Sequence, residues 1–468
     1  MESALTHNRD TICAVSTAPG SGGIAVIRVS GPTAIEGVER IWKGAKLSGA
    51  LSHTVHLGTL TDPADGSNLD QAVAAVYRSP NSFTGDDVVE LSVHGSPYVQ
   101  RRLLRILIDH CGIRAANPGE FTMRAFSSGK LSLTQAEAVA DIIASDSKAA
   151  HRIATTQFSG KTHTRLTQLR EDLTSLAALL ELELDFSEED VEFADRRLLI
   201  DKTLQVKEEI SRLLNSFQTG KAIKEGVPVA IAGATNAGKS SLLNQLLDDD
   251  RAIVSDIHGT TRDTIEATAE IEDYLFRFID TAGLRATDDL IERLGIERSH
   301  NAVANATVTL LVIDSSEVDS EERIAGEEAK IRQMMNPAGR LVTLLNKTDI
   351  AAEKPIYPMD GEKEGVIRLP ISAQTGAGIE ELRSTLVKIM AESHNSSDII
   401  ITNERHRRQL QEALESITLV EKALRDGLSA DLIAIDIRAT IHHLSLLTGD
   451  ITTSDLLTHI FSRFCIGK

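Results

Sequence analysis

The chain has 468 residues, of which 41% are hydrophobic, 25% charged and only 3% aromatic. This length predicts about three domains, and the composition is that of an ordinary globular protein, which excludes a disordered or fibrous class. Acidic residues number 68 and basic residues 49, and the resulting net charge of -19 argues against nonspecific coating of nucleic acid by the whole surface.

Cysteine usage and hydropathy bear on the cellular compartment. The three cysteines, Cys13, Cys111 and Cys465, are widely separated, which argues against a disulfide framework and against a metal knuckle. The first ten residues lack the apolar core of a signal peptide, and no later stretch approaches about 18 uninterrupted apolar residues. We therefore expect a cytoplasmic protein without a membrane span.

The N-terminal quarter alternates short β-type runs with Gly, Pro and Ser breaks, which is typical of strands joined by turns. The runs are Thr11 to Ser16, Gly23 to Ser30, His53 to Leu60, Ala72 to Tyr77 and Val88 to Val93. Residues 1–125 are therefore expected to form an α+β domain.

Helical patterns follow. Ser132 and Gln135 form a Ser-x-x-Gln capping box before an apolar run. Leucines then recur at three and four residues on one stripe, which predicts the core of a helical bundle; they are Leu166, Leu169, Leu173, Leu176 and Leu180. Further helical patterns cover 404–424 and 432–447, so residues 126–225 and 392–468 are expected to be two halves of one helical domain.

Residues 226–391 change to strand-helix alternation, which indicates a mostly parallel, doubly wound sheet inserted into the helical domain. The strand candidates are Val227 to Ala232, Leu275 to Ile279, Val308 to Ile313, Leu341 to Leu345 and Val366 to Ile371. The predicted fold is thus a multidomain α/β protein with three parts.

A phosphate loop follows the first of these strands. Residues 233–240 read Gly-Ala-Thr-Asn-Ala-Gly-Lys-Ser, which matches Gly-x4-Gly-Lys-Ser between a strand and a helix. The glycines let backbone N–H groups face phosphate oxygens, Lys239 is expected to bridge the β and γ phosphates, and Ser240 to bind Mg²⁺. This context makes a chance match improbable.

Three more nucleotide motifs end later strands in the order that GTPases require. In Asp280-Thr-Ala-Gly283, the Asp280 carboxylate can hold the coordination shell of Mg²⁺, and the Gly283 N–H can contact a γ phosphate. Asn346-Lys-Thr-Asp349 supplies a carboxylate that accepts from N1–H and the 2-amino group of guanine, donors that adenine lacks. Ser372-Ala373 is expected to offer a backbone N–H to the guanine carbonyl. The four motifs together predict a GTP site.

Hydrolysis needs a group that orients the attacking water. In Ras-like enzymes this group is a glutamine that follows Asp-Thr-Ala-Gly. Here that position is Leu284, which cannot orient water. Thr261, between the first two motifs, is the expected second Mg²⁺ hydroxyl. Asn236 could bind a monovalent cation, or it could simply tolerate a turn. Glu292 could polarise water, or it could be a solvated acid.

The chain resembles the family of tRNA-modification GTPases known as MnmE or TrmE over nearly its whole length. The likeness rests on Asp10-Thr-Ile, Gly22-Gly-Ile, Ile27-Arg-Val-Ser-Gly31, Asn81-Ser-Phe-Thr-Gly85, His94-Gly95, Pro118-Gly-Glu-Phe-Thr122, Arg124-Ala-Phe126, Gln135-Ala-Glu-Ala138, Asp280 to Arg285, Arg293 to Arg298 and Phe464-Cys-Ile-Gly-Lys468. Fragments spread over three domains are far more specific than a phosphate loop.

The resemblance implies particular site residues. It implies a K⁺ site at Asn236, Ser255, Ile257 and Thr260, with Glu292 as catalytic acid/base beside Asn236 and Lys239, and a folate site at Arg28, Glu90, Lys130 and Lys468. The GTP contacts expected from the motifs and the resemblance together are Asn236, Ala237, Gly238, Lys239, Ser240, Ser241, Ser255, Asp256, Ile257, His258, Gly259, Thr260, Thr261, Asp280, Thr281, Ala282, Gly283, Asn346, Lys347, Asp349, Ser372 and Ala373.

The resemblance also implies a process and partners. GTP hydrolysis, activated by K⁺ and by dimerisation, would drive carboxymethylaminomethyl addition at C5 of the tRNA wobble uridine U34. The cofactors would be Mg²⁺, K⁺ and 5-formyl- or methylene-tetrahydrofolate. The partners would be a second copy of the chain, tRNA, and an FAD-dependent MnmG-like protein in a heterotetramer. The N-terminal domain would carry folate binding and dimerisation.

The sequence also departs from the family pattern in places and leaves rival functions open. Where the family commonly has Arg-Pro and a second glycine, this chain has Ala234-Thr235 and Ser96. A ribosome-assembly GTPase is the main alternative, although the only RNA-like motif is the common Gly-x-x-Gly at 20–23. A membrane-remodelling GTPase would need a membrane-binding segment, which the sequence lacks. Cys465 has no feature that assigns it a role.

Overall fold

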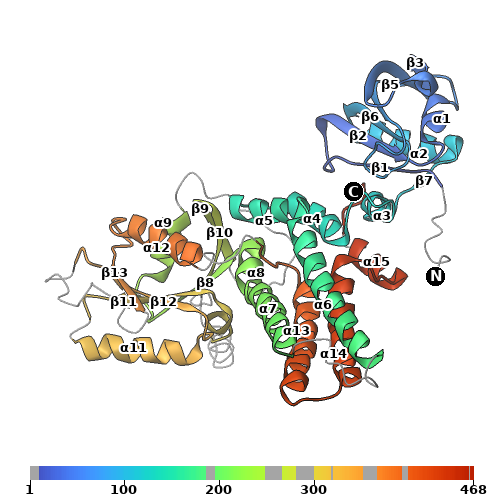
Figure 1. Ribbon diagram of the computed structural model, residues 1–468. Helices are drawn as coiled ribbons and strands as arrows, with labels where there is room; N and C mark the ends of the chain where they lie inside the picture. The colour runs from blue at the N-terminus through green and yellow to red at the C-terminus, as the bar shows by residue number, and fades with distance from the viewer. Residues whose placement is uncertain are drawn as a thin grey trace, which may run out of the picture. The chain divides into compact units, whose positions relative to one another are not determined.

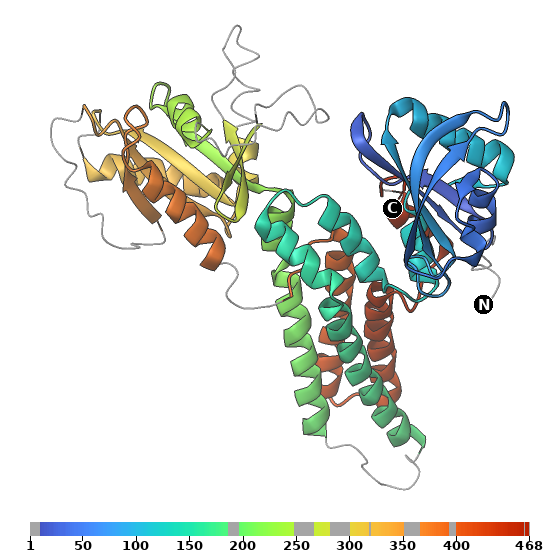
Figure 2. The ribbon, with the colours of Figure 1, turned by 90° about the horizontal axis from the view of Figure 1, so that it is seen from above.

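The computed structural model describes residues 10–185, 196–247, 266–280, 300–317, 320–350, 366–392, 399–462 and 464–467. These residues form two compact units, described separately below (Figures 1 and 2). The first contains 1–143, 155–207 and 412–468, and the second contains 144–154 and 208–411. No helix in these described ranges is long and apolar enough to cross a membrane.

The first unit begins with a seven-stranded sheet of order β3-β4-β5-β6-β2-β1-β7. Its strands are β1 (Ile12–Val15), β2 (Gly22–Ser30), β3 (Trp42–Gly44), β4 (Thr54–Thr61), β5 (Asn68–Tyr77), β6 (Val88–Gly95) and β7 (Arg114–Ala115). The five predicted strands are confirmed within a few residues. Only the short β3 and β7 were not predicted, because two or three residues show no alternation.

The two faces of this sheet differ in what covers them. Ile27, Leu91 and their inward neighbours pack in one cluster with α1 (Ala34–Glu39) and α2 (Pro97–Cys111). Side chains alternate across a strand, so Arg28 and Glu90, which are paired across β2 and β6, lie on the opposite face. The same cross-strand row continues through Ala75 to Val55, which is 67% exposed. This second face is exposed at β4, whereas Phe121 packs with Ile12 and Ala14 at its β1 end. It is called the open face below.

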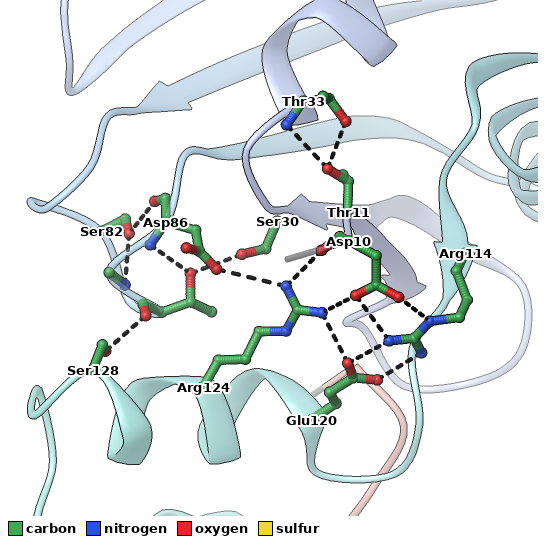
Figure 3. A network of polar contacts seen from close by, with 12 residues as sticks. Asp10, Thr11, Ser30, Thr33, Ser82, Asp86, Arg114, Glu120, Arg124 and Ser128 are labelled. Atoms are coloured by element: carbon green, nitrogen blue, oxygen red, sulfur yellow. Dashed lines mark hydrogen bonds and ion pairs between the residues drawn. The ribbon is translucent and has the colours of Figure 1, made fainter. Parts of the chain in front are cut away.

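A network of ion pairs fixes the start of β1 to α3 (Glu120–Ser127) (Figure 3). Arg124, buried on α3, donates to the Asp10 carboxylate at 2.8 Å and to Glu120 at 2.9 Å. Arg114 donates to the same two carboxylates, each at 2.7 Å. The Arg114 hydrogen bond lowers the pKa of Asp10 most. Burial alone would raise the pKa of Glu120, but bonds from Arg114, the Asn117 N–H and Arg124 outweigh burial and lower it.

Arg124→Met is expected to destabilise this domain by about 3–5 kcal/mol at pH 7, because buried Glu120 loses a partner. In the unfolded chain these carboxyl groups have pKa values of about 4, and folding lowers them. Their ionised forms therefore stabilise the fold at pH values above about 4. This contribution is lost as the pH falls through the pKa values of the folded state. The penalty should therefore shrink in acid. Urea unfolding followed by fluorescence of Trp42, the single tryptophan, measures this domain. Equal penalties for Arg124→Met and the exposed control Arg40→Met would contradict the role.

Helices complete the first unit. They are α4 (Leu133–Ile143), α6 (Lys161–Asp185), α14 (Ala430–Thr448), α15 (Ser454–Phe461) and the parts of α5 (Lys148–Phe158), α7 (Arg196–Asn215) and α13 (Glu404–Arg425) that belong to it. The predicted capping box is confirmed: the Ser132 N–H donates to Gln135 at 3.0 Å, and the Gln135 N–H donates to Ser132 at 3.3 Å. The five leucines of the predicted stripe are each at most 3% exposed. They form the bundle core, as expected.

The second unit contains a six-stranded sheet of order β13-β12-β11-β8-β10-β9. Its strands are β8 (Val227–Gly233), β9 (Glu266–Ile271), β10 (Tyr274–Asp280), β11 (Val308–Asp314), β12 (Arg340–Asn346) and β13 (Val366–Pro370). All neighbours are parallel except β9 and β10. The helices include α8 (Phe217–Glu225), α9 (Lys239–Leu247), α11 (Glu321–Met334) and α12 (Ile379–Glu392). The doubly wound prediction is confirmed, and only the edge strand β9 was missed.

Candidate functional site

The phosphate loop joins the end of β8 to the start of α9, as the motif predicts. Gly233 has φ +141°, and a Cβ there would meet the Val312 carbonyl oxygen at 2.2 Å. Gly238 has φ +101°, and a Cβ there would meet Asn346 Nδ2 at 2.1 Å. Both positions require glycine because side chains are excluded by backbone strain and by contact.

Lys239 is buried within this loop. Its Nζ donates to the carbonyl oxygens of Gly233 and Ala234 at 2.8 and 2.7 Å. Ser240 follows in the first turn of α9 and is exposed. A helix start with its N–H groups, an ammonium and a hydroxyl is the arrangement that binds polyphosphate with a divalent cation.

Asn346 connects three loops of the site. It is 2% exposed, donates from Nδ2 to the Ala237 carbonyl at 2.7 Å, and accepts the Ala373 N–H at 2.9 Å. Asp349 Oδ1 accepts the Ser372 hydroxyl at 2.6 Å. The phosphate loop is therefore bonded to both segments predicted to recognise guanine. Of the Ser372-Ala373 pair predicted to offer a backbone N–H to the guanine carbonyl, the Ala373 N–H is bonded to Asn346 in this structure.

Lys347 stabilises the same loop from its other side. It adopts φ +67°, and its Nζ forms an ion pair of 2.5 Å with Asp314 at the end of β11. Burial alone would raise the pKa of Asp314, but the hydrogen bond and charge of Lys347 and the bonds from Ser316 lower it instead. The carboxylate is thus held ionised beside the lysine.

A cavity of about 350 Å³ lies beside the phosphate loop. Its lining comes from Gly233 to Thr235, from the end of β11, and from α11 residues such as Arg323 and Ile324. The lining does not include Asp349, Ser372 or Ala373, so this cavity is distinct from the predicted guanine pocket.

Part of the predicted site lies outside the described residues. The residues concerned are Ser255, Asp256, Ile257, His258, Gly259, Thr260, Thr261, Thr281, Ala282, Gly283, Glu292 and Lys468. The backbone of Asp280 ends β10 and pairs with Ile231 of β8, which places it at the same sheet edge as the phosphate loop. Asn236 is exposed in the loop with φ +65°, a conformation that asparagine tolerates.

The predicted folate residues Arg28 and Glu90 lie together on the open face. Arg28 donates from Nε to Glu90 at 2.8 Å, and its Nη2 lies 2.7 Å from the same carboxylate oxygen. The Arg28 guanidinium also lies over the rings of Phe83 and Phe121, at 5.4 and 5.7 Å from their centroids. The sequence alone predicted no role for either ring. Phe83 lies in the family motif at residues 81–85, and Phe121 lies in the one at residues 118–122.

Lys130 and the C-terminal tail complete this region within the first unit. The Lys130 Cε lies 3.9 Å from a Cβ built on Gly85, in the segment that carries Phe83. The Ser16 hydroxyl donates to the Gly467 carbonyl at 3.1 Å. A Cβ at Gly467 would meet the Val15 carbonyl oxygen at 2.1 Å. The tail therefore contacts the end of β1, whose residue Ala14 is paired with Arg28.

The positions that depart from the family pattern keep regular backbone geometry. Ser96 has φ -77° and begins α2, so this position does not need glycine. Ala234 and Thr235 are exposed in the phosphate loop and remove none of the contacts described above. Cys465 is exposed and forms no disulfide within the part of the chain that the structure describes.

Known proteins are similar to this chain over nearly its whole length. Residues 133–465 match the MnmE helical domain model, and residues 11–130 match that of the GTP-binding protein TrmE N-terminus. Proteins called tRNA modification GTPase MnmE are similar throughout: that of Christiangramia forsetii is 45% identical over 98% of this chain and 99% of its own. That of Parabacteroides distasonis is 46% identical over 98% and 100%. This chain belongs to the MnmE family of tRNA modification GTPases.

Proposed function

We propose that this GTPase drives carboxymethylaminomethyl addition at C5 of tRNA wobble uridine U34, together with an FAD-dependent MnmG-like partner. The observation that carries the proposal is the presence in one chain of two built sites. One is the phosphate loop bonded through Asn346 to the guanine segments. The other is the Arg28–Glu90 pair with the C-terminal tail beside it.

The first site supports GTP hydrolysis with cations. Ser240, next to the buried Lys239, suits one hydroxyl ligand of Mg²⁺, and Thr261 would supply the second. Bound K⁺ would supply the positive charge that an arginine finger gives in other GTPases. Asn236 is exposed in this loop and would offer its amide oxygen to that ion together with Ser255, Ile257 and Thr260. Glu292 would then polarise the attacking water.

The second site supports folate binding. A guanidinium suits the glutamate carboxylate of a folate, and a carboxylate suits donors on the pterin ring. Phe83 adds exposed aromatic surface beside Arg28, and the buried ring of Phe121 holds the guanidinium in place. Lys130 and Lys468 would add positive charge for the remaining carboxylate.

The open face supports a homodimer. Val55 and Leu57 are 67% and 65% exposed on β4, and Ile24 on β2 is 68% exposed. The cross-strand row from Val55 reaches Arg28, so this apolar surface is continuous with the folate site. Exposed apolar patches of this kind mark association surfaces, and a second copy would cover the site.

Arg28→Gln is expected to weaken folate binding by about 10- to 100-fold, because a charge-assisted hydrogen bond is lost. GTP turnover should stay at the wild-type level, since Arg28 lies in the other unit. In cells lacking the gene, this variant should fail to restore U34 modification, measured by nucleoside mass spectrometry. Arg40→Gln, at an exposed position of the same domain, is the matched control and should restore it.

The same experiment tests the proposal as a whole. If deleting the gene leaves U34 modification unchanged, the proposed function is wrong. Altered ribosomal subunit profiles in that strain would instead favour the ribosome-assembly alternative.

A further inference from the structure

The outer side of α2 carries an aromatic and basic stripe. Tyr98 is 65% exposed, and Arg101 and Arg105 are exposed, whereas Leu103 and Leu107 are buried against the sheet. Residues 98, 101 and 105 follow the helical spacing of three and four, so they lie on one face. This combination does not serve the core of the domain.

The charge around this stripe is unlike that of the whole chain. Segment 97–108 contains three arginines and no acidic residue, and the exposed Asp109 follows Arg105 by four residues on the same helix. Arg102 donates to Asp62 at 2.6 Å, whereas no ion pair involves Arg101 or Arg105 among the residues that the structure describes. Residues 11–130 hold eleven Lys and Arg against ten Asp and Glu, so the net charge of -19 resides elsewhere. A polyanion meets little repulsion on this domain.

A glycine-rich segment, which ends in the first two residues of β2, lies beside the first turns of α2. The Gly-x-x-Gly segment 20–23 is exposed, and Gln100 of α2 donates to the Gly20 carbonyl at 3.4 Å. A Cβ at Gly20 or Gly23 would have no neighbour within 4 Å. Packing therefore does not explain either glycine, and only Gly20, with φ +123°, has a backbone conformation that favours glycine. A segment with only one small side chain, that of Ser21, lets a nucleic-acid backbone approach closely, as Gly-x-x-Gly loops do in KH domains.

We propose that Tyr98, Arg101, Arg105 and the segment 20–23 form an RNA-binding surface, here called the α2 surface. Arginines neutralise phosphates, and an exposed tyrosine ring stacks on an unpaired base. The inference rests on the proposed function, in which the RNA is tRNA. Because α2 covers the face of the sheet opposite to Arg28, the α2 surface holds the tRNA body and takes no part in chemistry.

The test measures tRNA binding by the full-length protein against salt concentration. Arg101→Gln/Arg105→Gln should weaken binding about tenfold and reduce the slope of log K against log salt by about 2. Tyr98→Ala should weaken binding about fivefold or more, whereas Tyr98→Phe keeps the stacking ring and should bind normally. Lys330→Gln/Lys388→Gln removes two exposed charges from the second unit and is the matched control.

The outcomes separate this inference from the proposed function. If the wild-type protein binds no tRNA, with or without its flavoprotein partner, both are overturned. If the wild type binds and the double arginine variant keeps its affinity and slope, only the α2 surface is wrong. An equal loss in the lysine control would show a general charge effect and would also overturn it. GTP turnover should be unchanged in every variant.

Discussion

Asp349→Asn is expected to lower kcat/KM for GTP by about 10⁴-fold, because an amide N–H would face donors on guanine. Asn keeps one oxygen that can accept the Ser372 hydroxyl, so the loop should keep its shape. Xanthine has an acceptor where guanine has its 2-amino group. The variant should therefore hydrolyse XTP better than GTP.

Competition between GTP and XTP at equal concentration measures this exchange of specificity. Thermal unfolding of the variant without nucleotide controls for folding, since Asp349 is exposed and contributes no core packing. A variant that lost GTP and failed to gain XTP would show that Asp349 does not read the base.

Exchanging K⁺ for Na⁺ is expected to lower GTP turnover by about 10³-fold, the low end of what an arginine finger contributes. Asn236→Ala should bring the rate in K⁺ down to the rate in Na⁺. The physical reason is that a smaller or displaced cation no longer neutralises charge that develops between the β and γ phosphates.

Single-turnover rates in the two salts, at matched ionic strength, measure this effect. Nucleotide affinity should change little in Asn236→Ala, because Lys239 and the loop backbone remain. Equal rates in K⁺ and Na⁺ would refute the cation mechanism and leave Asn236 as a residue that only tolerates φ +65°. Glu292→Ala, tested in K⁺, separates water activation from cation binding.

Much of the fold followed from local patterns. The period of the leucine stripe, the capping box at Ser132 and the strand runs each depend on neighbouring residues, so the sequence alone placed them. Of the two edge strands in this sheet, β13 was predicted and β9 was not. Its residues Glu266–Ile271 lack the continuous apolar character of the central strands.

In the candidate sites too, the contiguous motifs were predicted from the sequence, and the contacts between distant segments were not. The phosphate loop is contiguous, so its glycines, Lys239 and Ser240 were predicted together, with their roles. Asn346 was predicted only as part of a guanine motif. Its bonds to Ala237 and Ala373, which join segments from three strand ends, depend on the order of strands in the sheet.

The phosphate loop was determined by sequence alone because consecutive backbone N–H groups and one following lysine make it. Family resemblance pointed to Arg28 and Glu90, but only the register of β2 and β6 decided that they pair. Only the tertiary structure brought Gly467 to Ser16, across 451 residues of chain. A site made of consecutive residues depends only on the local sequence, whereas contacts between distant segments exist only after the sheet and helices have packed.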